Sequence, residues 1–425
     1  MNNTLIKVDG SEFEKLATIS DDTLNQLISK RLLKKTDDNR FKISFVGYIE
    51  INGTVLISVP YGVSTNQLAN NRVEIQHLIK KVIKVIQFFS QHYSGANEFC
   101  ISGKIAASFK ILEDFENYGL ITRNKRTNSL RGTGAIDWTK TIRKNTPAKS
   151  GKNWIYESLV RRNKKIHESH ELTALHRWAL CKSLGHIQIV SDEFEHMNDL
   201  FTNILSNEEA SGIASRQIGI ATRDRDLLFL DLVQKLLSND ATETISAIYT
   251  SSFNIIWEKA LQFVFKHEKK LKKKLPNVIW ADDDTSMQQL HIKPRSSSGS
   301  PEVDIAFMNN NELYILDAKY YDLFNTGYRP GLTDLWKQFY YEQAYKIATS
   351  SNSTPKGGLI FPYFDTGKKL TIKKFSTVQF HVESANSDKV EMANIPAFVA
   401  SIDDVLEQFL TGISSQKDYI RNMYN

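Results

Sequence analysis

The 425-residue sequence contains only two cysteines, Cys100 and Cys181, and neither lies in a spacing typical of metal ligands. A disulfide-stapled scaffold and a zinc cluster are therefore disfavoured, and the composition fits a reducing cytoplasm. No run of about 18 apolar residues occurs, and the N-terminus lacks the charged-then-apolar layout of a signal peptide. These absences predict a soluble, cytoplasmic protein with no membrane partner.

The phosphate-binding loop GxxxxGK[ST] is also absent, so we expect that this chain binds and hydrolyses no nucleotide itself. Charge of either sign is in little excess, with 54 Lys and Arg against 48 Asp and Glu. The resulting net charge of +6 is compatible with nucleic-acid binding but does not establish it. What the sequence does have is ordinary globular composition and enough length for two or three domains.

The most informative stretch is Ser300–Tyr321, SPEVDIAFMNNNELYILDAKYY. Two β-rich runs flank Asn310-Asn311, and asparagine tolerates the positive φ that tight hairpin turns require. Pairing about this turn sets four pairs on one face: Met308 with Leu313, Ala306 with Ile315, Asp304 with Asp317, and Glu302 with Lys319. The other face then carries an apolar layer for a core: Val303, Ile305 and Phe307 against Tyr314, Leu316 and Ala318.

Two carboxylates directly across a hairpin repel each other unless a cation lies between them. Asp304 and Asp317, with the backbone carbonyl of Ala318, supply the hard oxygen ligands that Mg²⁺ prefers, and Mn²⁺ is the alternative ion. Lys319 lies beside Asp317, where it can orient or deprotonate an attacking water or neutralise charge on a phosphate. Two alternatives stay open: an ordinary hairpin with a Glu302–Lys319 salt bridge, and Glu302 as the metal ligand.

An aspartate, a hairpin and Asp-x-Lys form the pattern of the PD-(D/E)xK nuclease superfamily. The run LYILDAKYY, followed by a helix with Lys-Gln-Phe-Tyr-Tyr, more narrowly resembles the McrC-like and LlaJI-like nuclease subunits of restriction systems. A second segment, Gly132–Ile142 ahead of Ile155-Tyr156, is also similar to the LlaJI-like family. One departure is that Val303, rather than proline, directly precedes the first aspartate.

The resemblance implies a metal-dependent endonuclease that cuts double-stranded DNA together with a separate McrB-like AAA+ GTPase or ATPase. It also implies two supporting residues. Glu258, in the apolar helix Phe253–Lys266, matches a glutamate that superfamily members supply to the metal site, although a surface carboxylate is the alternative. Gln338, in the helix predicted over Asp334–Ala348, matches a glutamine near the scissile phosphate.

Two basic segments are candidates for contacts outside the cutting centre. One would place ammonium groups along a DNA backbone, giving salt-sensitive affinity without sequence preference, unless it is only a solvated face: Lys269, Lys270, Lys272, Lys273 and Lys274. The other, Arg123–Gly151, is predicted as a loop or finger. It either is an exposed basic loop or contacts DNA or the AAA+ partner, with these residues as the partner-contact candidates: Arg131, Lys140 and Arg143.

Hydrophobic patterning predicts an α/β protein. Residues 1–150 form an α+β domain, with a hairpin about Asn52-Gly53 and a helix over Val73–Tyr93; residues 151–245 form a helical connector, with the helical pattern continuing to Ile248. The resemblance implies that residues 246–425 form a PD-(D/E)xK domain, and the patterning there predicts a mixed sheet flanked by helices and closed by a helix over Phe398–Leu410.

The sequence thus predicts the DNA endonuclease subunit of a bacterial McrBC/LlaJI-like restriction system, active in phage defence. One rival is a standalone type II restriction or repair nuclease whose first 200 or so residues read DNA directly. The other rival is a DNA-binding or assembly protein with a degenerate nuclease fold. The intact Asp304, Asp317 and Lys319 argue against the second rival.

Overall fold

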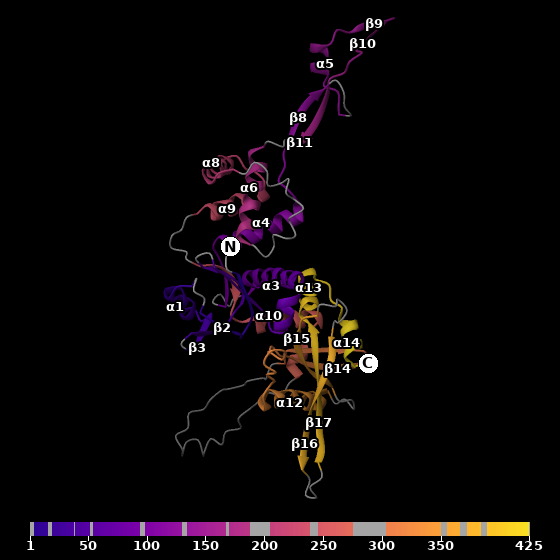
Figure 1. The fold of residues 1–425 in the computed structure, drawn as a ribbon. Coiled ribbons are helices and arrows are strands. Elements are labelled where there is room, and N and C mark those ends of the chain that lie inside the picture. The colour runs from indigo at the N-terminus through magenta and orange to yellow at the C-terminus, as the bar shows by residue number, and fades with distance from the viewer. Residues whose placement is uncertain are drawn as a thin grey trace, which may run out of the picture. The chain divides into compact units, whose positions relative to one another are not determined.

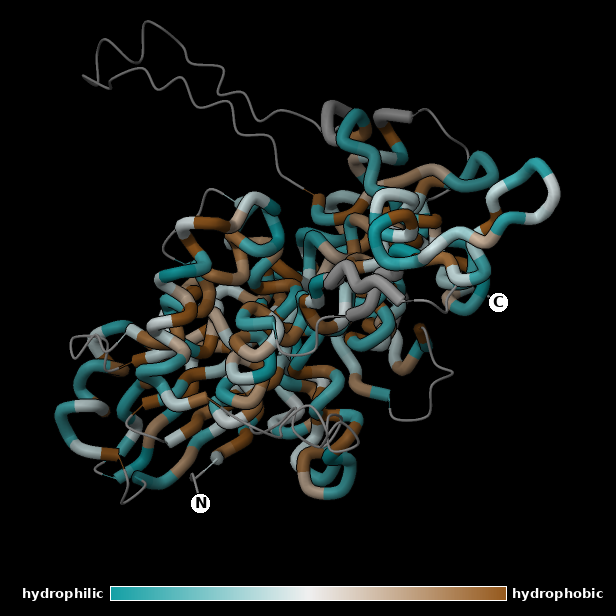
Figure 2. The backbone as a smooth tube through the Cα atoms, turned by 90° about the horizontal axis from the view of Figure 1, so that it is seen from above, coloured by the Kyte–Doolittle hydropathy of each residue, from teal (hydrophilic) through white to brown (hydrophobic). Residues whose placement is uncertain are grey.

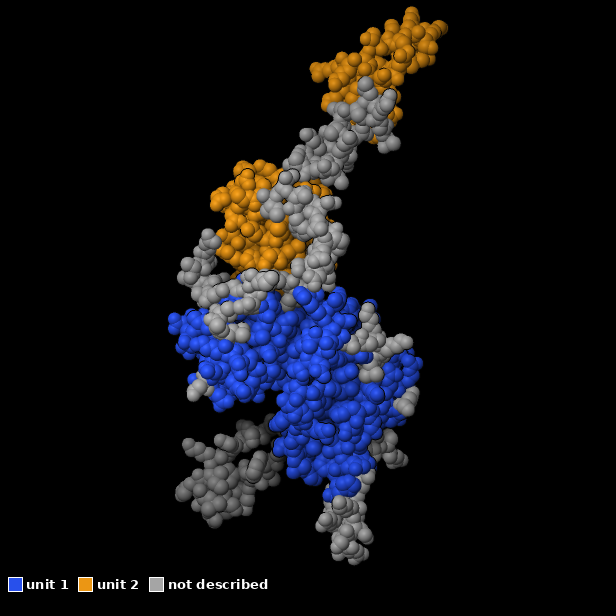
Figure 3. Space-filling view, in the orientation of Figure 1, with its two compact units in different colours: residues 1–101, 247–425 blue, residues 102–246 orange. Residues whose placement is uncertain are grey.

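The computed structural model describes residues 4–15, 19–37, 39–51, 54–93, 98–129, 134–166, 170–187, 205–238, 245–274, 303–349, 355–365, 372–383 and 389–424. The chain forms two compact units, residues 1–101 with 247–425 and residues 102–246 (Figure 3). Both combine helices with strands (Figure 1), as the predicted α/β class requires. In the part of the chain that is described, no helix is long and apolar enough to cross a membrane.

The first sheet has five strands in the order β1-β6-β5-β12-β7. The predicted hairpin is formed by β5 and β6, although Asn52 and Gly53 lie outside the described residues. One strand contradicts the prediction, because β12 lies where the helical pattern was expected to continue. The strands are β1 (Thr4–Val8), β5 (Val46–Ile51), β6 (Thr54–Val59), β7 (Phe99–Ser102) and β12 (Ile245–Thr250).

Helix α3 (Arg72–His92) packs on this sheet and matches the predicted Val73–Tyr93 helix. Its apolar stripe is buried, as the 3.6-residue spacing predicts, and apolar and polar residues alternate along the elements in Figure 2. Lys81 of α3 forms ion pairs with Asp403 and Glu407 of α13 (Ile402–Thr411) at 2.8 and 3.1 Å. A smaller sheet completes this region with β2 (Glu12–Glu14), β3 (Leu33–Asp37), β4 (Arg40–Ile43), α1 (Asp21–Ser29) and α2 (Thr65–Asn70).

The second sheet is mixed, in the order β13-β14-β15-β17-β16. Strands β14, β15 and β17 run parallel, whereas β13 and β16 pair antiparallel at the two edges. Part of β17 lies where the closing helix was predicted, and α13 begins only at Ile402. The strands are β13 (Ile305–Asn309), β14 (Glu312–Ala318), β15 (Lys356–Tyr363), β16 (Ile372–Glu383) and β17 (Lys389–Ser401).

The β13–β14 hairpin has the predicted turn and register. Asn310 and Asn311 have φ of 49° and 63°, and the strands pair Met308 with Leu313 and Ala306 with Ile315. Helices cover both faces of the sheet, as predicted for a mixed sheet flanked by helices, because parallel strands continue the sheet beyond the hairpin. Helix α12 (Leu332–Thr349) packs on one face, and the other face stacks the rings of Phe265, Phe307 and Tyr314 near α10 (Phe253–Val264) and α14 (Gln416–Tyr424).

Among its described residues, the second unit has a core of four helices: α4 (Gly103–Tyr118), α6 (Glu171–His186), α8 (Asn207–Ile218) and α9 (Asp224–Leu237). Between α4 and α6 the chain forms a finger, residues 124–166, seen in Figure 1 as a two-stranded ribbon that carries a small tip. The helical connector predicted over residues 151–245 is therefore wrong at Asn153–Ile155 and Arg161–Ile166, which form strands. The finger comprises β8 (Asn124–Ser129), α5 (Trp138–Lys144), β9 (Ala148–Ser150), β10 (Asn153–Ile155) and β11 (Arg161–Ile166).

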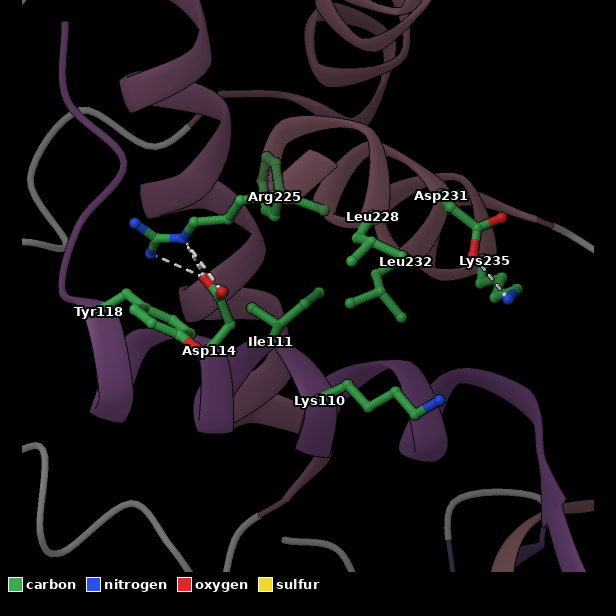
Figure 4. A pocket seen from close by; sticks show the side chains of 10 residues that line it. Lys110, Ile111, Asp114, Tyr118, Arg225, Leu228, Asp231, Leu232 and Lys235 are labelled. Atoms are coloured by element: carbon green, nitrogen blue, oxygen red, sulfur yellow. Dashed lines mark hydrogen bonds and ion pairs between the residues drawn. The ribbon is translucent and has the colours of Figure 1, made fainter. Parts of the chain in front are cut away.

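A pocket of about 470 Å³ lies between α4 and α9 (Figure 4). At one end Arg225 donates to Asp114 from Nε at 3.0 Å and from Nη2 at 2.8 Å. At the other end Lys235 pairs with Asp231 at 2.8 Å. Because both of its acids are paired with bases, the pocket offers apolar surface rather than catalytic groups.

Candidate active site

The two predicted aspartates lie at the open end of the β13–β14 hairpin. Asp304 immediately precedes β13 and Asp317 is the penultimate residue of β14, so the register carries both side chains to the same place. The Ala318 N–H donates to Asp304 Oδ2 at 2.9 Å. Burial, and then the charge of Asp317, raise the pKa of Asp304 to about 8. The conflict between two carboxylates that the sequence predicts is therefore present.

Lys319 is tied to the same end of the sheet. Its backbone N–H donates to Ile360 O of β15 at 2.8 Å, and its side chain is buried, with 8% of the residue exposed. Nζ lies 2.6 Å from Asp317 Oδ2 and 3.1 Å from Asp334 Oδ1. Burial lowers the pKa of Lys319, but these two carboxylates more than offset it and the pKa is raised. Lys319 is accordingly a cation that two carboxylates hold in place.

Asp334 is a site residue that sequence reasoning missed. It lies in the first turn of α12, and its Oδ2 accepts a hydrogen bond from the Tyr321 hydroxyl at 2.9 Å. Although burial opposes it, the bonds from Tyr321 and Lys319 lower the pKa of Asp334. The sequence does show an acid at the start of the helix that follows Asp-x-Lys. The loop between them gives no indication that Asp334 lies next to Lys319.

Glu258 of α10 is the glutamate that the superfamily resemblance suggests for the metal site. Its Oε1 accepts hydrogen bonds from Lys259 Nζ and Gln262 Nε2, each at 2.8 Å. Gln262 Nε2 also donates to the backbone carbonyl of Asp304 at 2.7 Å, and the charge of Glu258 contributes to the raised pKa of Asp304. The structure thus brings Glu258 toward the carboxylate pair and adds Gln262 as a bridge that sequence reasoning missed.

Gln338 of α12 is fully buried against the strand that carries Asp317. Its Nε2 donates to Ile315 O at 2.8 Å and to Glu342 Oε1 at 3.1 Å. Burial raises the pKa of Glu342 to about 7, against the lowering effect of Gln338. A Cβ at Gly357 would overlap the Glu342 carboxyl, so β15 needs glycine there. Gln338 contacts the backbone of β14, two residues before Asp317.

The chemistry of the donor set decides whether these residues suit a metal ion. Among the described residues, no three His, Cys, Asp or Glu side chains are grouped to hold a metal. The pair Asp304 and Asp317 is a smaller set, to which the Ala318 carbonyl adds a third oxygen from the same strand end. The two acids repel each other, and the pKa of Asp304 is raised. A hard divalent cation would relieve this repulsion, so these residues fit one.

The predicted DNA-contact lysines lie in a short 3-10 helix, η3 (Lys269–Lys274). Lys269 and Lys270 are exposed, and Lys270 Nζ lies 3.3 Å from Glu268 Oε2. Leu271 is buried and anchors the segment, because its carbonyl accepts a bond from Tyr345 at 2.8 Å. The side chains of Lys272, Lys273 and Lys274 lie outside the described residues.

Two of the predicted partner-contact residues, Lys140 and Arg143, are exposed on α5 of the finger, and Arg131 lies outside the described residues. Asp137 caps α5 by accepting from Lys140 N at 3.2 Å and from Arg162 Nε at 3.0 Å, and the bond from Arg162 lowers the pKa of Asp137. The tip also exposes large apolar side chains that the prediction missed: Trp138, Ile142, Trp154 and Ile155.

Comparison with known proteins identifies relatives of the chain. The Type II restriction enzyme BsuMI component YdjA of Bacillus subtilis (strain 168) is 22% identical over 424 residues, covering 93% of this chain and 87% of that protein. Two solved structures from Thermococcus gammatolerans are also similar. A half-complex of McrB AAA+ hexamers with bound McrC has a TM-score of 0.36 at 13% identity, covering 96% of this chain and 100% of that chain. The cryo-EM structure of the McrBC complex has a TM-score of 0.25 at 12% identity, covering 60% and 84%.

A sequence model of the LlaJI restriction endonuclease family matches residues 45–403, which is most of the chain. The match includes the hairpin, α10, α12 and the finger, and it confirms the resemblance seen in the sequence. The chain belongs to the LlaJI restriction endonuclease family.

Proposed function

We propose that this chain is the DNA-cutting subunit of its restriction system and hydrolyses phosphodiester bonds in double-stranded DNA with Mg²⁺, or alternatively Mn²⁺. The observation that carries the proposal is the convergence of Asp304, Asp317 and Lys319 at one end of the hairpin. Asp304, Asp317 and the Ala318 carbonyl would hold the ion, which supplies Lewis-acid polarisation of a phosphate oxygen. The proposed PD-(D/E)xK domain is the predicted segment 246–425.

Lys319 acts as a cation in this mechanism. Its raised pKa favours electrostatic stabilisation of the transition state over proton abstraction from water, the other role the sequence left open. Asp334 and Tyr321 keep the ammonium group in place, because Asp334 pairs with both. Asp334 would still hold Lys319 if Asp317 served as a metal ligand. Glu258 and Gln338 support the site, Glu258 beside Asp304 and Gln338 on the backbone of β14.

We further propose that cleavage depends on a separate McrB-like AAA+ GTPase or ATPase. The chain contains no GxxxxGK[ST] loop, and its relative YdjA is named as one component of a restriction enzyme. The finger is the proposed contact surface, with Arg131, Lys140 and Arg143 as the cations that reach the partner. Trp138 and Trp154 are also exposed on the finger and offer apolar area.

The test is incubation of the purified chain with plasmid and Mg²⁺ or Mn²⁺, with and without the AAA+ protein of its system and GTP or ATP. We expect cleavage only in the presence of partner, nucleotide and divalent ion, and none by an Asp317→Ala control. Efficient site-specific cleavage by the chain alone would favour a standalone type II enzyme. Failure to cut in every arm would overturn the nuclease proposal and favour an assembly protein.

A further inference from the structure

Tyr320, the residue directly after Lys319, is held by the first sheet rather than by the sheet that carries the active site. Its hydroxyl accepts a hydrogen bond from the Tyr61 backbone N–H at 3.1 Å and donates one to Asp9 Oδ2, also at 3.1 Å. Asp9 follows β1 and Tyr61 follows β6, so both partners come from neighbouring strands of the first sheet. One hydroxyl therefore fastens the chain beside Lys319 to a second sheet.

The side chains around the Tyr320 hydroxyl are closely packed. The Tyr320 ring packs 4.6 Å from the Tyr61 ring and 5.5 Å from the Phe253 ring, measured between centroids. Gly10 has φ of 71°, and a Cβ there would collide with the Tyr61 hydroxyl. The position next to Asp9 thus has to be glycine for the Tyr61 ring to reach Tyr320.

A second set of bonds ties the same loop to the segment that leads from strand β6 of the first sheet into α2. Asn325, in the loop that follows Tyr320, donates from Nδ2 to Val63 O at 3.0 Å. Its Oδ1 accepts from Thr65 N at 3.0 Å. The loop after Lys319 is therefore anchored at both Tyr320 and Asn325, whereas the Lys319 side chain itself is a flexible four-carbon stem.

We propose that Asp9 and Tyr320 are positioning residues that hold Lys319 in register with Asp317 and Asp334. Strand pairing fixes Lys319 on one side, through its N–H to Ile360 O, and the Tyr320 hydroxyl fixes the residue on its other side. Without that second anchor the Lys319 backbone can rotate and Nζ leaves the two carboxylates. The catalytic meaning of this inference rests on the proposed nuclease function, but the effect on Lys319 does not.

Asp9 is needed as a hydrogen-bond acceptor rather than as a charge. Burial raises the pKa of Asp9 to about 7, although the bond from Tyr320 lowers it; Lys42 and Asp322 are the charged neighbours, and their effects oppose each other. An amide oxygen at this position can accept the same bond from the Tyr320 hydroxyl. Asp9→Asn should therefore rescue what Asp9→Leu loses.

The test compares Tyr320→Phe with Tyr61→Phe in the full-length chain. The two substitutions each remove one hydroxyl from the same ring cluster, and no hydrogen bond from the Tyr61 hydroxyl is seen among the described residues. Lysine acetylation by acetic anhydride, followed by mass spectrometry, reports access to Lys319, and exposed Lys337 serves as internal reference. We expect Tyr320→Phe to speed acetylation of Lys319 about fivefold, as loss of an ordinary hydrogen bond allows. Tyr61→Phe should leave it unchanged.

Cleavage by the chain with its partner is the second measurement. We expect Tyr320→Phe and Asp9→Leu to lower kcat about tenfold or more with KM unchanged, because misplacing a catalytic group by a fraction of an ångström is costly. Asp9→Asn and Tyr61→Phe should keep the parent rate, and thermal melting confirms that each variant is folded. Unchanged Lys319 acetylation in folded Tyr320→Phe, or equal losses in Asp9→Asn and Asp9→Leu, would overturn the inference. A parent chain that cuts no DNA would defeat the proposed function, while the acetylation result still decides this one.

Discussion

The β13–β14 hairpin and the β8–β11 ribbon of the finger each pair two strands antiparallel, but the hairpin is the edge of a five-stranded sheet and the finger ribbon stands alone. Helices cover the hairpin on both faces, so its charged groups are partly buried and perturb one another, as the raised pKa of Asp304 shows. The finger tip instead leaves Trp138, Trp154 and its cations exposed. In the proposed function, the buried hairpin therefore carries the reacting groups, and the exposed finger contacts the partner.

The strongest test of the hairpin's role is to remove either member of its carboxylate pair. We predict that Asp304→Ala and Asp317→Ala each abolish cleavage and weaken Mg²⁺ binding in calorimetry while the chain stays folded, because each removes a charged ligand from a pair in conflict. Asp418→Ala, which removes an exposed acid of α14, is the matched control and should cut normally. Parent-level cleavage by either active-site variant means that the metal site lies elsewhere.

Loss of Lys319 should separate chemistry from binding. We predict that Lys319→Ala keeps metal and DNA affinity but lowers the cleavage rate by orders of magnitude, as expected for a group that acts mainly in the transition state. Lys319→Arg should rescue poorly, because the broader guanidinium does not fit between Asp317 and Asp334. If rate and DNA affinity fall by the same factor, Lys319 is only a phosphate anchor.

The finger is expected to act on the partner rather than on DNA. We predict that the chain raises nucleotide hydrolysis by the AAA+ protein, and that replacing Arg131, Lys140 and Arg143 together by alanine reduces this stimulation severalfold. Mg²⁺ binding at Asp304 and Asp317 should be unaffected. The control replaces Lys110, Lys182 and Lys235, which lie on the helices of the same unit. Equal effects of the two triple variants would reduce the finger to a source of general positive charge.

The hairpin was predictable because its signals are local. Asn310-Asn311 and the alternation on either side of it determine the register, and with it the meeting of Asp304 and Asp317. Asp334 and Asp9 were not predicted, because their contacts with Lys319 and Tyr320 join segments that are distant in sequence. The β12 strand, read as helix, has the β-branched and aromatic residues of ISAIYT and is defined by pairing with distant β5. The sequence alone therefore indicated the hairpin carboxylates and Lys319, but not the contacts by which the first sheet holds Tyr320.

The buried pair also predicts how stability depends on pH. The pKa of Asp304 lies above its ordinary value of 3.8 and reaches about 8, so between these values the folded chain binds more protons than the unfolded chain. Protonated Asp304 therefore contributes its full stabilisation below pH 3.8, and this stabilisation is lost as the pH rises through about 8. We predict that the free energy of unfolding of the metal-free chain falls less steeply with pH in Asp304→Asn. The pKa values of Asp9 and Glu342 are raised into the same range, so the variant is compared with the parent chain. Identical slopes of unfolding free energy against pH in the two chains would contradict the raised pKa of Asp304.

The smallest expected effect concerns the lysine run beside the hairpin. Replacing Lys269, Lys270, Lys272, Lys273 and Lys274 by glutamine should weaken DNA binding equally for all sequences. For every lysine that pairs with a DNA phosphate, its replacement should lower the slope of log affinity against log salt by about 0.9. Lys270 already has Glu268 at 3.3 Å, so Lys270→Gln alone should change the slope less than Lys269→Gln. That difference separates a surface that follows the DNA backbone from one that is merely solvated, because a solvated face leaves the slope unchanged in every variant.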